Sequence, residues 1–111
     1  MTMKPIVGDH SPWGRIQTVT HYGPSACSVT TASHGGFWVH PATMVQIPER
    51  WRSTAYSHGG WFEEDCDWAI PYLALHLWEH EPTLERGAAV RNAALLTFTA
   101  CHKGEPEELR P

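Results

Sequence analysis

The first forty residues hold three short segments rich in β-branched and aromatic residues, and these segments constrain the fold more than any other feature. Residues 15–22 (RIQTVTHY) and 27–32 (CSVTTA) flank a Gly23-Pro24 turn signal, which predicts two antiparallel strands. Residues 37–39 follow Gly35-Gly36 and can add a third short strand. The pattern therefore predicts a β-meander.

The second half of the chain has helical spacing of its apolar residues. Residues 63–78 begin with four carboxylates, which stabilise the positive end of a helix dipole. Pro71 conflicts with a single helix, so we expect a kink there or a fresh start near Trp68. Residues 83–102 predict a second long helix. Its expected N-cap is Thr83, and its expected apolar side comprises Ala89, Ala93, Leu96 and Ala100.

Together these segments predict an α+β fold in which a short antiparallel β-meander packs against two main helices. Residues 1–14, interrupted by Pro and Gly, predict an irregular N-terminal arm. We expect residues 15–103 to form a single α+β domain, which a length of 111 residues supports. Residues 104–111 predict a flexible C-terminal tail. Between the strands and the helices, residues 41–47 predict a short helix and residues 50–60 a surface loop.

Three widely spaced cysteines argue against a disulfide framework. Small secreted domains normally carry a denser, even-numbered set, so we interpret Cys27, Cys66 and Cys101 as reduced thiols of a cytoplasmic protein. Residues 1–10 lack the apolar run of a signal peptide. The longest apolar stretch, residues 69–75, is too short to span a bilayer. We therefore expect no membrane partner.

Charge is distributed unevenly along the chain. Residues 1–60 hold four basic and two acidic residues, and residues 61–111 hold four basic and ten acidic residues, so the halves carry +2 and −6. The absence of a basic stripe argues against direct binding of nucleic acid. The acidic second half suits a partner protein with a basic surface, or serves solubility alone.

Four carboxylates, of Glu63, Glu64, Asp65 and Asp67, surround Cys66. They could form a dipole-stabilising first helical turn, which is the plain structural interpretation. They could instead bind a divalent cation or act as acid and base, although only Glu63 and Asp67 would point the same way on a helix. A third interpretation is a negative patch that binds Arg or Lys of a partner. Aromatic residues that would strengthen such a patch are Trp61, Phe62 and Trp68.

Histidines and glycines give weaker signals. His34, Gly35 and Gly36 could expose backbone amides to a ligand, but a plain turn between strands is the better interpretation. His76 and His80 have the i, i+4 spacing of zinc ligands on one helical face. They lack the HExxH pattern, and scattered histidines more often form ordinary hydrogen bonds. We therefore expect neither a metal nor a cofactor.

Three segments resemble a known family of uncharacterised domains when taken together. They are residues 11–22 (SPWGRIQTVTHY), 32–37 (ASHGGF) and 59–69 (GGWFEEDCDWA). The family is a domain of unknown function carried mainly by bacteriophages, plasmids and related mobile elements. The resemblance covers residues 11–77, so the second helix would be a local addition. It implies no activity, but small proteins of such elements often inhibit host defences, including restriction and CRISPR systems.

Two classes of function remain open from the sequence. The leading hypothesis is a non-enzymatic module that binds a host protein through an acidic and aromatic surface, as an inhibitor of anti-CRISPR or antirestriction type. The residues expected in that surface are Glu63, Glu64, Asp65, Asp67, Trp61, Trp68, His34, Gly35 and Gly36. The alternative is a small metal- or thiol-dependent hydrolase that uses His34, Cys66, Asp67, His76 and His80. A homodimer formed through exposed Trp residues is a further alternative.

Overall fold

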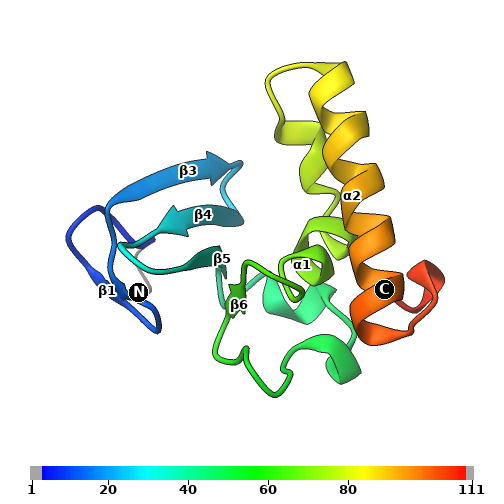
Figure 1. Cartoon of the computed structure of the whole chain (residues 1–111), viewed down its shortest axis with the longest axis horizontal. Helices are drawn as coiled ribbons and strands as arrows, with labels where there is room; N and C mark the ends of the chain where they lie inside the picture. Colours follow the sequence, from blue (N-terminus) through cyan, green and yellow to red (C-terminus); the bar gives the residue numbers. More distant parts are fainter. Residues whose placement is uncertain (1–3, 110–111) are drawn as a thin grey trace.

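The computed structural model describes residues 4–109 and has an α+β architecture, as the sequence predicts. A β-sheet forms one half of the molecule and the helices form the other (Figure 1). The strands are β1 (His10–Ser11), β2 (Gly14–Arg15), β3 (Thr18–Tyr22), β4 (Ala26–Thr30), β5 (Gly35–Val39) and β6 (Trp61–Glu63). The α-helices are α1 (Ala69–Ala74) and α2 (Leu84–His102). The 3-10 helices are η1 (Met44–Gln46), η2 (Glu49–Trp51), η3 (Leu77–His80) and η4 (Pro106–Leu109).

The main sheet is an antiparallel meander with the strand order β3-β4-β5-β6. The predicted pairing of the first three strands is confirmed, because Cys27 of β4 lies opposite both His21 of β3 and Trp38 of β5. The fourth strand was not predicted. Trp61 of β6 pairs with Trp38, and Phe62 pairs with Phe37. A separate antiparallel pair, β1 and β2, occupies part of the expected irregular arm.

The prediction of one helix over residues 63–78 is wrong. Residues 61–63 form β6, α1 spans only Ala69–Ala74, and η3 follows it. The alternative start near Trp68 is confirmed, because Trp68 is the N-cap residue of α1. Pro71 fits there because it lies in the first helical turn, where backbone N–H groups have no partner inside the helix. His76 then has φ 53° and ends the helical run.

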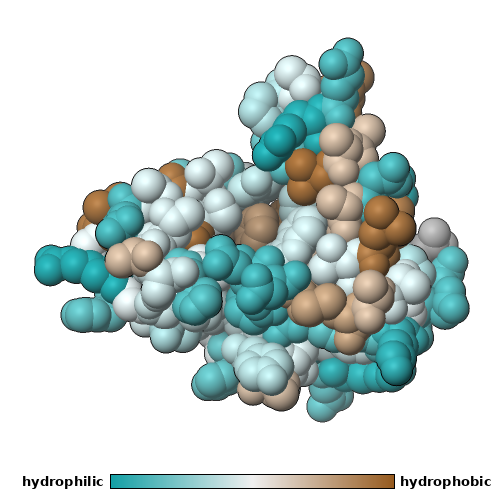
Figure 2. All heavy atoms as spheres, viewed as in Figure 1, coloured by the Kyte–Doolittle hydropathy of each residue, from teal (hydrophilic) through white to brown (hydrophobic). Residues whose placement is uncertain are grey.

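The prediction of a helix over residues 83–102 is confirmed, but its inner face differs from the expected one. The Thr83 hydroxyl accepts a hydrogen bond from the Arg86 N–H and caps α2. The buried residues of α2 are Gly87, Ala94 and Phe98. The side of the helix expected to be apolar faces solvent, with Leu96 72% exposed. Figure 2 shows apolar side chains on the outer surface of α2.

Hydrophobic residues pack on both faces of the sheet. On the helical side, Phe37 and Phe62 contact a core that includes Tyr72, Leu73 and Phe98. On the opposite face, a smaller cluster holds Ile16, Cys27, Val29 and Trp38, with Trp13, Val19 and Trp61 packed against it. Because β5 lies between two neighbouring strands and two apolar layers, all five of its residues are buried.

The connecting segments are more ordered than the sequence suggests. The expected surface loop at residues 50–60 includes the end of η2, and Trp51 there is 7% exposed. The expected short helix at residues 41–47 is the 3-10 helix η1. Residues 104–109 of the expected flexible tail contain η4, and Leu109 is buried in the main core. Residues 1–3 of the arm and 110–111 of the tail lie outside the described residues. Within residues 4–109, the helices do not combine the length and apolar character needed to cross a membrane.

The interpretation of three reduced thiols is also wrong. Cys66 and Cys101 form a disulfide, with their Cα atoms 5.8 Å apart, which joins the turn before α1 to the last turn of α2. Cys27 is a buried free thiol in the central strand β4, and burial raises its pKa to about 11. The sequence could not show the bond because the two cysteines are 35 residues apart and meet only in the folded chain.

Candidate functional site: an acidic pocket

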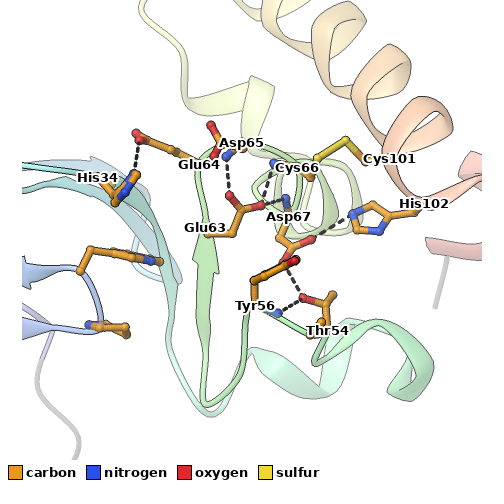
Figure 3. Close-up of a pocket in the computed structure, with 14 residues that line it drawn as sticks. His34, Thr54, Tyr56, Glu63, Glu64, Asp65, Cys66, Asp67, Cys101 and His102 are labelled. Atoms are coloured by element: carbon orange, nitrogen blue, oxygen red, sulfur yellow. Dashed lines mark hydrogen bonds and ion pairs between the residues drawn. A yellow bond between two sulfur atoms is a disulfide. The ribbon is translucent and has the colours of Figure 1, made fainter.

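A cavity of about 650 Å³ lies where the sheet meets the helical half (Figure 3). One wall comes from Trp13 and from the start of β5, another from the turn at residues 63–67, and a third from the end of α2. Residues 54–56 close the remaining side. We call this cavity the acidic pocket, because four of its lining residues are Glu or Asp and none of them, all within residues 4–109, is Lys or Arg.

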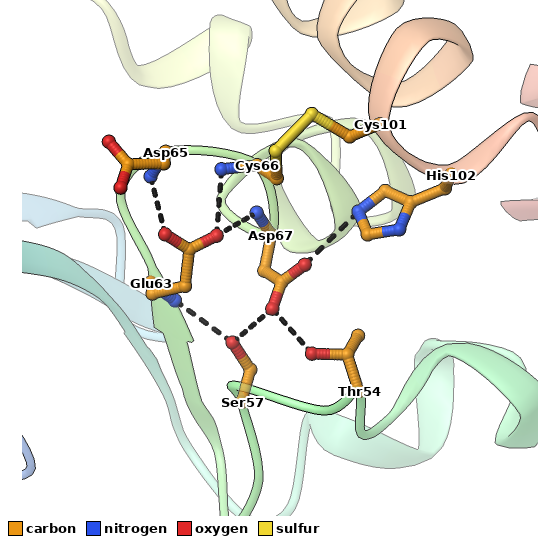
Figure 4. Close-up of a disulfide and its surroundings, with 8 residues drawn as sticks. All are labelled: Thr54, Ser57, Glu63, Asp65, Cys66, Asp67, Cys101 and His102. Carbon is orange, nitrogen blue, oxygen red and sulfur yellow. Dashed lines mark hydrogen bonds and ion pairs between the residues drawn. A yellow bond between two sulfur atoms is a disulfide. The ribbon is translucent and has the colours of Figure 1, made fainter.

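Glu63 organises the turn that carries the other carboxylates. One of its oxygens accepts a hydrogen bond from the Asp65 N–H, and the other accepts from the N–H groups of Cys66 and Asp67, each at 2.7 Å (Figure 4). The carboxylate thus satisfies three backbone donors of the turn, as a capping side chain satisfies free N–H groups at a helix start. Glu63 is therefore a structural residue of the turn, and the expected i, i+4 pairing of Glu63 and Asp67 on a helix does not occur.

Asp67 lies at the buried back of the acidic pocket, with its side chain 2% exposed. Its carboxylate accepts hydrogen bonds from the Thr54 and Ser57 hydroxyls (Figure 4). Its other oxygen lies 3.1 Å from His102 Nε2, which makes an ion pair when the imidazole is protonated. Ser57 in turn accepts the Glu63 N–H. This network fixes the negative charge of Asp67 in place and joins three separate segments of the chain.

Glu64 and Asp65 are the exposed carboxylates of the pocket. The Glu64 carboxylate lies 3.5 Å from His34 Nδ1, with its side chain 47% exposed. Asp65 makes no ion pair with any residue between positions 4 and 109. Figure 3 shows Glu64 directed towards His34, the residue immediately before β5. Both side chains are exposed, so they can contact a ligand that enters the pocket.

The aromatic residues at the pocket differ from those expected. Trp13 lines the pocket and packs edge-on against Trp61, with ring centroids 5.6 Å apart. Tyr56 also lines it and is 80% exposed. Trp61 and Trp68 are half-buried and do not line the pocket. Trp68 packs against Tyr72 in the main core, and Trp61 packs against Trp13.

Gly35 and Gly36 belong to β5, so the prediction that they form a turn is wrong. A Cβ atom at Gly36 would collide with the Phe62 carbonyl oxygen and the Trp13 ring. Gly35 lines the pocket, and a Cβ there would lie 3.2 Å from a Glu64 oxygen. The closest atom to a Cβ at Gly35 is the Val29 carbonyl oxygen of β4, so the two glycines allow β4, β6 and the Trp13 ring to lie close to β5.

The structure separates the residues suspected of hydrolysis. His34, Cys66 and Asp67 line the acidic pocket, whereas His76 and His80 do not. The predicted helical i, i+4 arrangement of His76 and His80 is wrong, because His76 has left-handed backbone angles outside any helix. Cys66 carries no thiol while it is bonded to Cys101. Within residues 4–109, no three His, Cys, Asp or Glu side chains are grouped so that they could hold a metal ion.

Sequence reasoning missed several lining residues, of which Trp13, Thr54, Tyr56 and His102 matter most. Trp13 belongs to the SPWG segment that carries the family resemblance, so a signal for it was present. No signal identifies His102, because it reaches Asp67 only through the packing of α2 on the turn. The pocket is therefore a product of tertiary structure.

Comparison with known proteins adds a family but no activity. No curated protein and no solved structure matches this chain. One family matches residues 7–104 and is described as a domain of unknown function. The match includes α2, so the expectation that the second helix is a local addition to the family domain is wrong. The acidic pocket, which draws on residues from Pro12 to His102, lies entirely inside the matched region. The chain belongs to the DUF7007 family.

Proposed function

We propose that this protein is a non-enzymatic binding module whose acidic pocket receives an arginine or lysine side chain of a partner protein. The observation that carries the proposal is the charge of the lining, which has four carboxylates and no Lys or Arg among the described residues. A cleft lined by charges of one sign concentrates the field and attracts ions of the opposite sign.

The pocket contains two kinds of carboxylate, those held by hydrogen bonds within the protein and those exposed to solvent. Glu63 and Asp67 are held by hydrogen bonds and supply negative charge from the inner wall. Glu64 and Asp65 are exposed and can pair with the cation directly. Trp13 and the exposed Tyr56 offer aromatic faces to a guanidinium, which favours arginine over lysine.

A titration with a short capped peptide containing one arginine tests the proposal. The control peptide carries citrulline, which has the same shape without the charge. Backbone NMR shifts should map arginine-peptide binding to the acidic turn, and added salt should weaken it because exposed charges are screened. The citrulline peptide should bind about fivefold more weakly or not at all.

The matched protein variants are Glu64→Gln/Asp65→Asn and Glu79→Gln/Glu107→Gln. Each pair removes two exposed negative charges, but only the first pair lines the acidic pocket. The first variant should lose binding of the arginine peptide and the second should keep it. Equal affinities of the two variants, or of the two peptides, would contradict the proposal.

A narrower proposal concerns the biological partner. The resemblance to domains of phages and plasmids supports a role as an inhibitor of a host defence system, with a host protein or complex of basic surface as the target. Phage plating on bacteria that carry a restriction or CRISPR system tests it. Expression of the wild-type protein should raise the efficiency of phage plating on these bacteria. Expression of the Glu64→Gln/Asp65→Asn variant should leave the efficiency unchanged. Unchanged plating across the defence systems tested would leave the narrower proposal without support.

A further inference from the structure

A second cavity, of about 430 Å³, shares no lining residue with the acidic pocket. It lies between residues 73–78, which connect α1 to η3, the middle of α2, and η4. Its walls contain two groups that can carry positive charge, His76 and Arg91, and one carboxylate, Glu107. Leu73, Leu95 and Leu109 are the aliphatic residues of its lining. This second cavity therefore combines a cationic part with an apolar part.

Both nitrogen-bearing groups lie against one indole ring. The His76 ring stacks on Trp78, with centroids 4.6 Å apart and planes inclined by 23°. The guanidinium carbon of Arg91 lies 4.7 Å from the Trp78 ring centroid. Stacking on an aromatic face fixes the plane of a guanidinium while its N–H edges stay available for hydrogen bonds. Trp78 thus orients two donor groups beside the same cavity.

The charge of Arg91 is not neutralised within residues 4–109, since no carboxylate there lies within ion-pair distance of its guanidinium. Glu107 lines the same cavity without pairing to it. His76 reaches its position through left-handed backbone angles, φ 53° and ψ 46°, which residues with a Cβ rarely adopt. Such backbone strain often accompanies binding sites, because the surrounding structure holds the side chain in one place.

We propose that the second cavity binds a small monocarboxylate that bears an apolar group. The planar guanidinium of Arg91 pairs with both carboxylate oxygens, and a His76 ring N–H donates to one of them. The apolar group lies against Leu73, Leu95 and Leu109. Glu107 disfavours a second negative charge, so the site selects a monoanion over a dianion. The proposal is independent of the function proposed for the acidic pocket.

Hexanoate and hexanamide are the probes that test it, because they have nearly the same shape and differ in charge. Assigned NMR shifts of the Trp78 indole N–H follow binding at this cavity and distinguish it from the other five tryptophans. Hexanoate should shift this signal, hexanamide should bind about tenfold more weakly, and acetate should also bind weakly because it lacks the apolar chain. A dicarboxylate of the same length should bind less tightly than hexanoate.

Two substitutions should move the hexanoate affinity in opposite directions. Arg91→Gln should lower it about tenfold or more, whereas Glu107→Gln should raise it. Arg15→Gln removes the same charge from an exposed position of β2 and should leave the affinity unchanged. If Arg91→Gln does not fold, Arg91→Lys keeps the charge but not the planar pairing, and it should still weaken binding severalfold. Equal binding of hexanoate and hexanamide, or equal effects of the Arg91 and Arg15 substitutions, would overturn the proposal.

Discussion

His102 Nε2 lies 3.1 Å from the carboxylate of Asp67, and the residues immediately before these two in the chain, Cys101 and Cys66, form a disulfide. The end of α2 and the acidic turn are thus joined twice, by a covalent bond and by a buried contact between an imidazole and a carboxylate one residue further along each segment. Both contacts lie in the wall of the acidic pocket. The position of the turn, and therefore of Glu64 and Asp65, depends on them.

Asp67→Asn should destabilise the protein far more than Asp65→Asn. The Asp67 carboxylate is buried and serves the hydroxyls of Thr54 and Ser57 as well as His102. Both hydroxyls donate to one carboxylate oxygen, and an uncharged amide accepts them more weakly while its NH₂ group takes the place of the oxygen that faces His102, so the cost should be about 2 kcal/mol or more. Asp65 is exposed, and its substitution should cost no more than about 0.5 kcal/mol. Urea unfolding measures both, and equal costs would contradict the structural role given to Asp67.

Removal of the disulfide should lower the stability and weaken binding at the acidic pocket. The bond closes a loop of 35 residues, and the chain-entropy model assigns a stabilisation of about 4 kcal/mol to such a loop. Urea unfolding with and without a phosphine reductant should show the loss for the wild-type protein. The Cys66→Ser/Cys101→Ser variant should have the stability of the reduced wild-type protein, and the reductant should not change it. The arginine peptide should bind the oxidised protein best, since only there does a covalent bond hold the turn against α2.

Local sequence signals predicted the elements that are determined locally. Thr83 caps α2 through its own side chain, and the β-branched segments before and after Gly23 form adjacent strands. The strand β6 escaped prediction because its partner β5 lies far along the chain, and the carboxylates after it suggested a helix start. In the structure, Glu63 caps a turn by accepting three backbone N–H groups. A carboxylate suits either arrangement, so sequence alone could not separate them.

The acidic pocket was predicted only in part, for a similar reason. The carboxylates and His34 were expected in one site, and they line one pocket. Nothing local indicated that Tyr56 would join them, or that His102 would reach Asp67. The buried face of α2 is likewise determined by the residues that pack against it. Gly87 allows the Trp78 backbone to lie close to the helix, and Phe98 packs on Trp51. Alanine spacing along the helix carries no information about those contacts.

Gly36→Ala should destabilise the fold although alanine is usually well tolerated. The added methyl would meet the Phe62 carbonyl oxygen and the Trp13 ring, so β6 or Trp13 must move. Overpacking of this kind costs about 1 to 3 kcal/mol. Ala32→Ser, at an exposed position before the same strand, should change the stability by less than about 0.5 kcal/mol. Thermal unfolding compares the two variants, and a neutral Gly36→Ala would show that the sheet edge is loosely packed.

Stability should fall as the pH rises above about 9, because two buried groups and one partly buried group resist ionisation in the folded protein. Burial raises the pKa of Cys27 from 9.0 to about 11 and that of Tyr22 from 10.0 to about 12. Burial, and then the hydrogen bond from its hydroxyl to Glu81, also raises the pKa of Tyr72. The unfolded chain therefore loses these protons first, so stability is complete below pH 9 and declines from there towards pH 12. Urea unfolding at several pH values measures the decline.

Tyr72→Phe should lower the stability at neutral pH, because Glu81 loses its hydroxyl donor, but it should flatten the alkaline decline. An equally steep decline in that variant would contradict the role of the Tyr72–Glu81 pair.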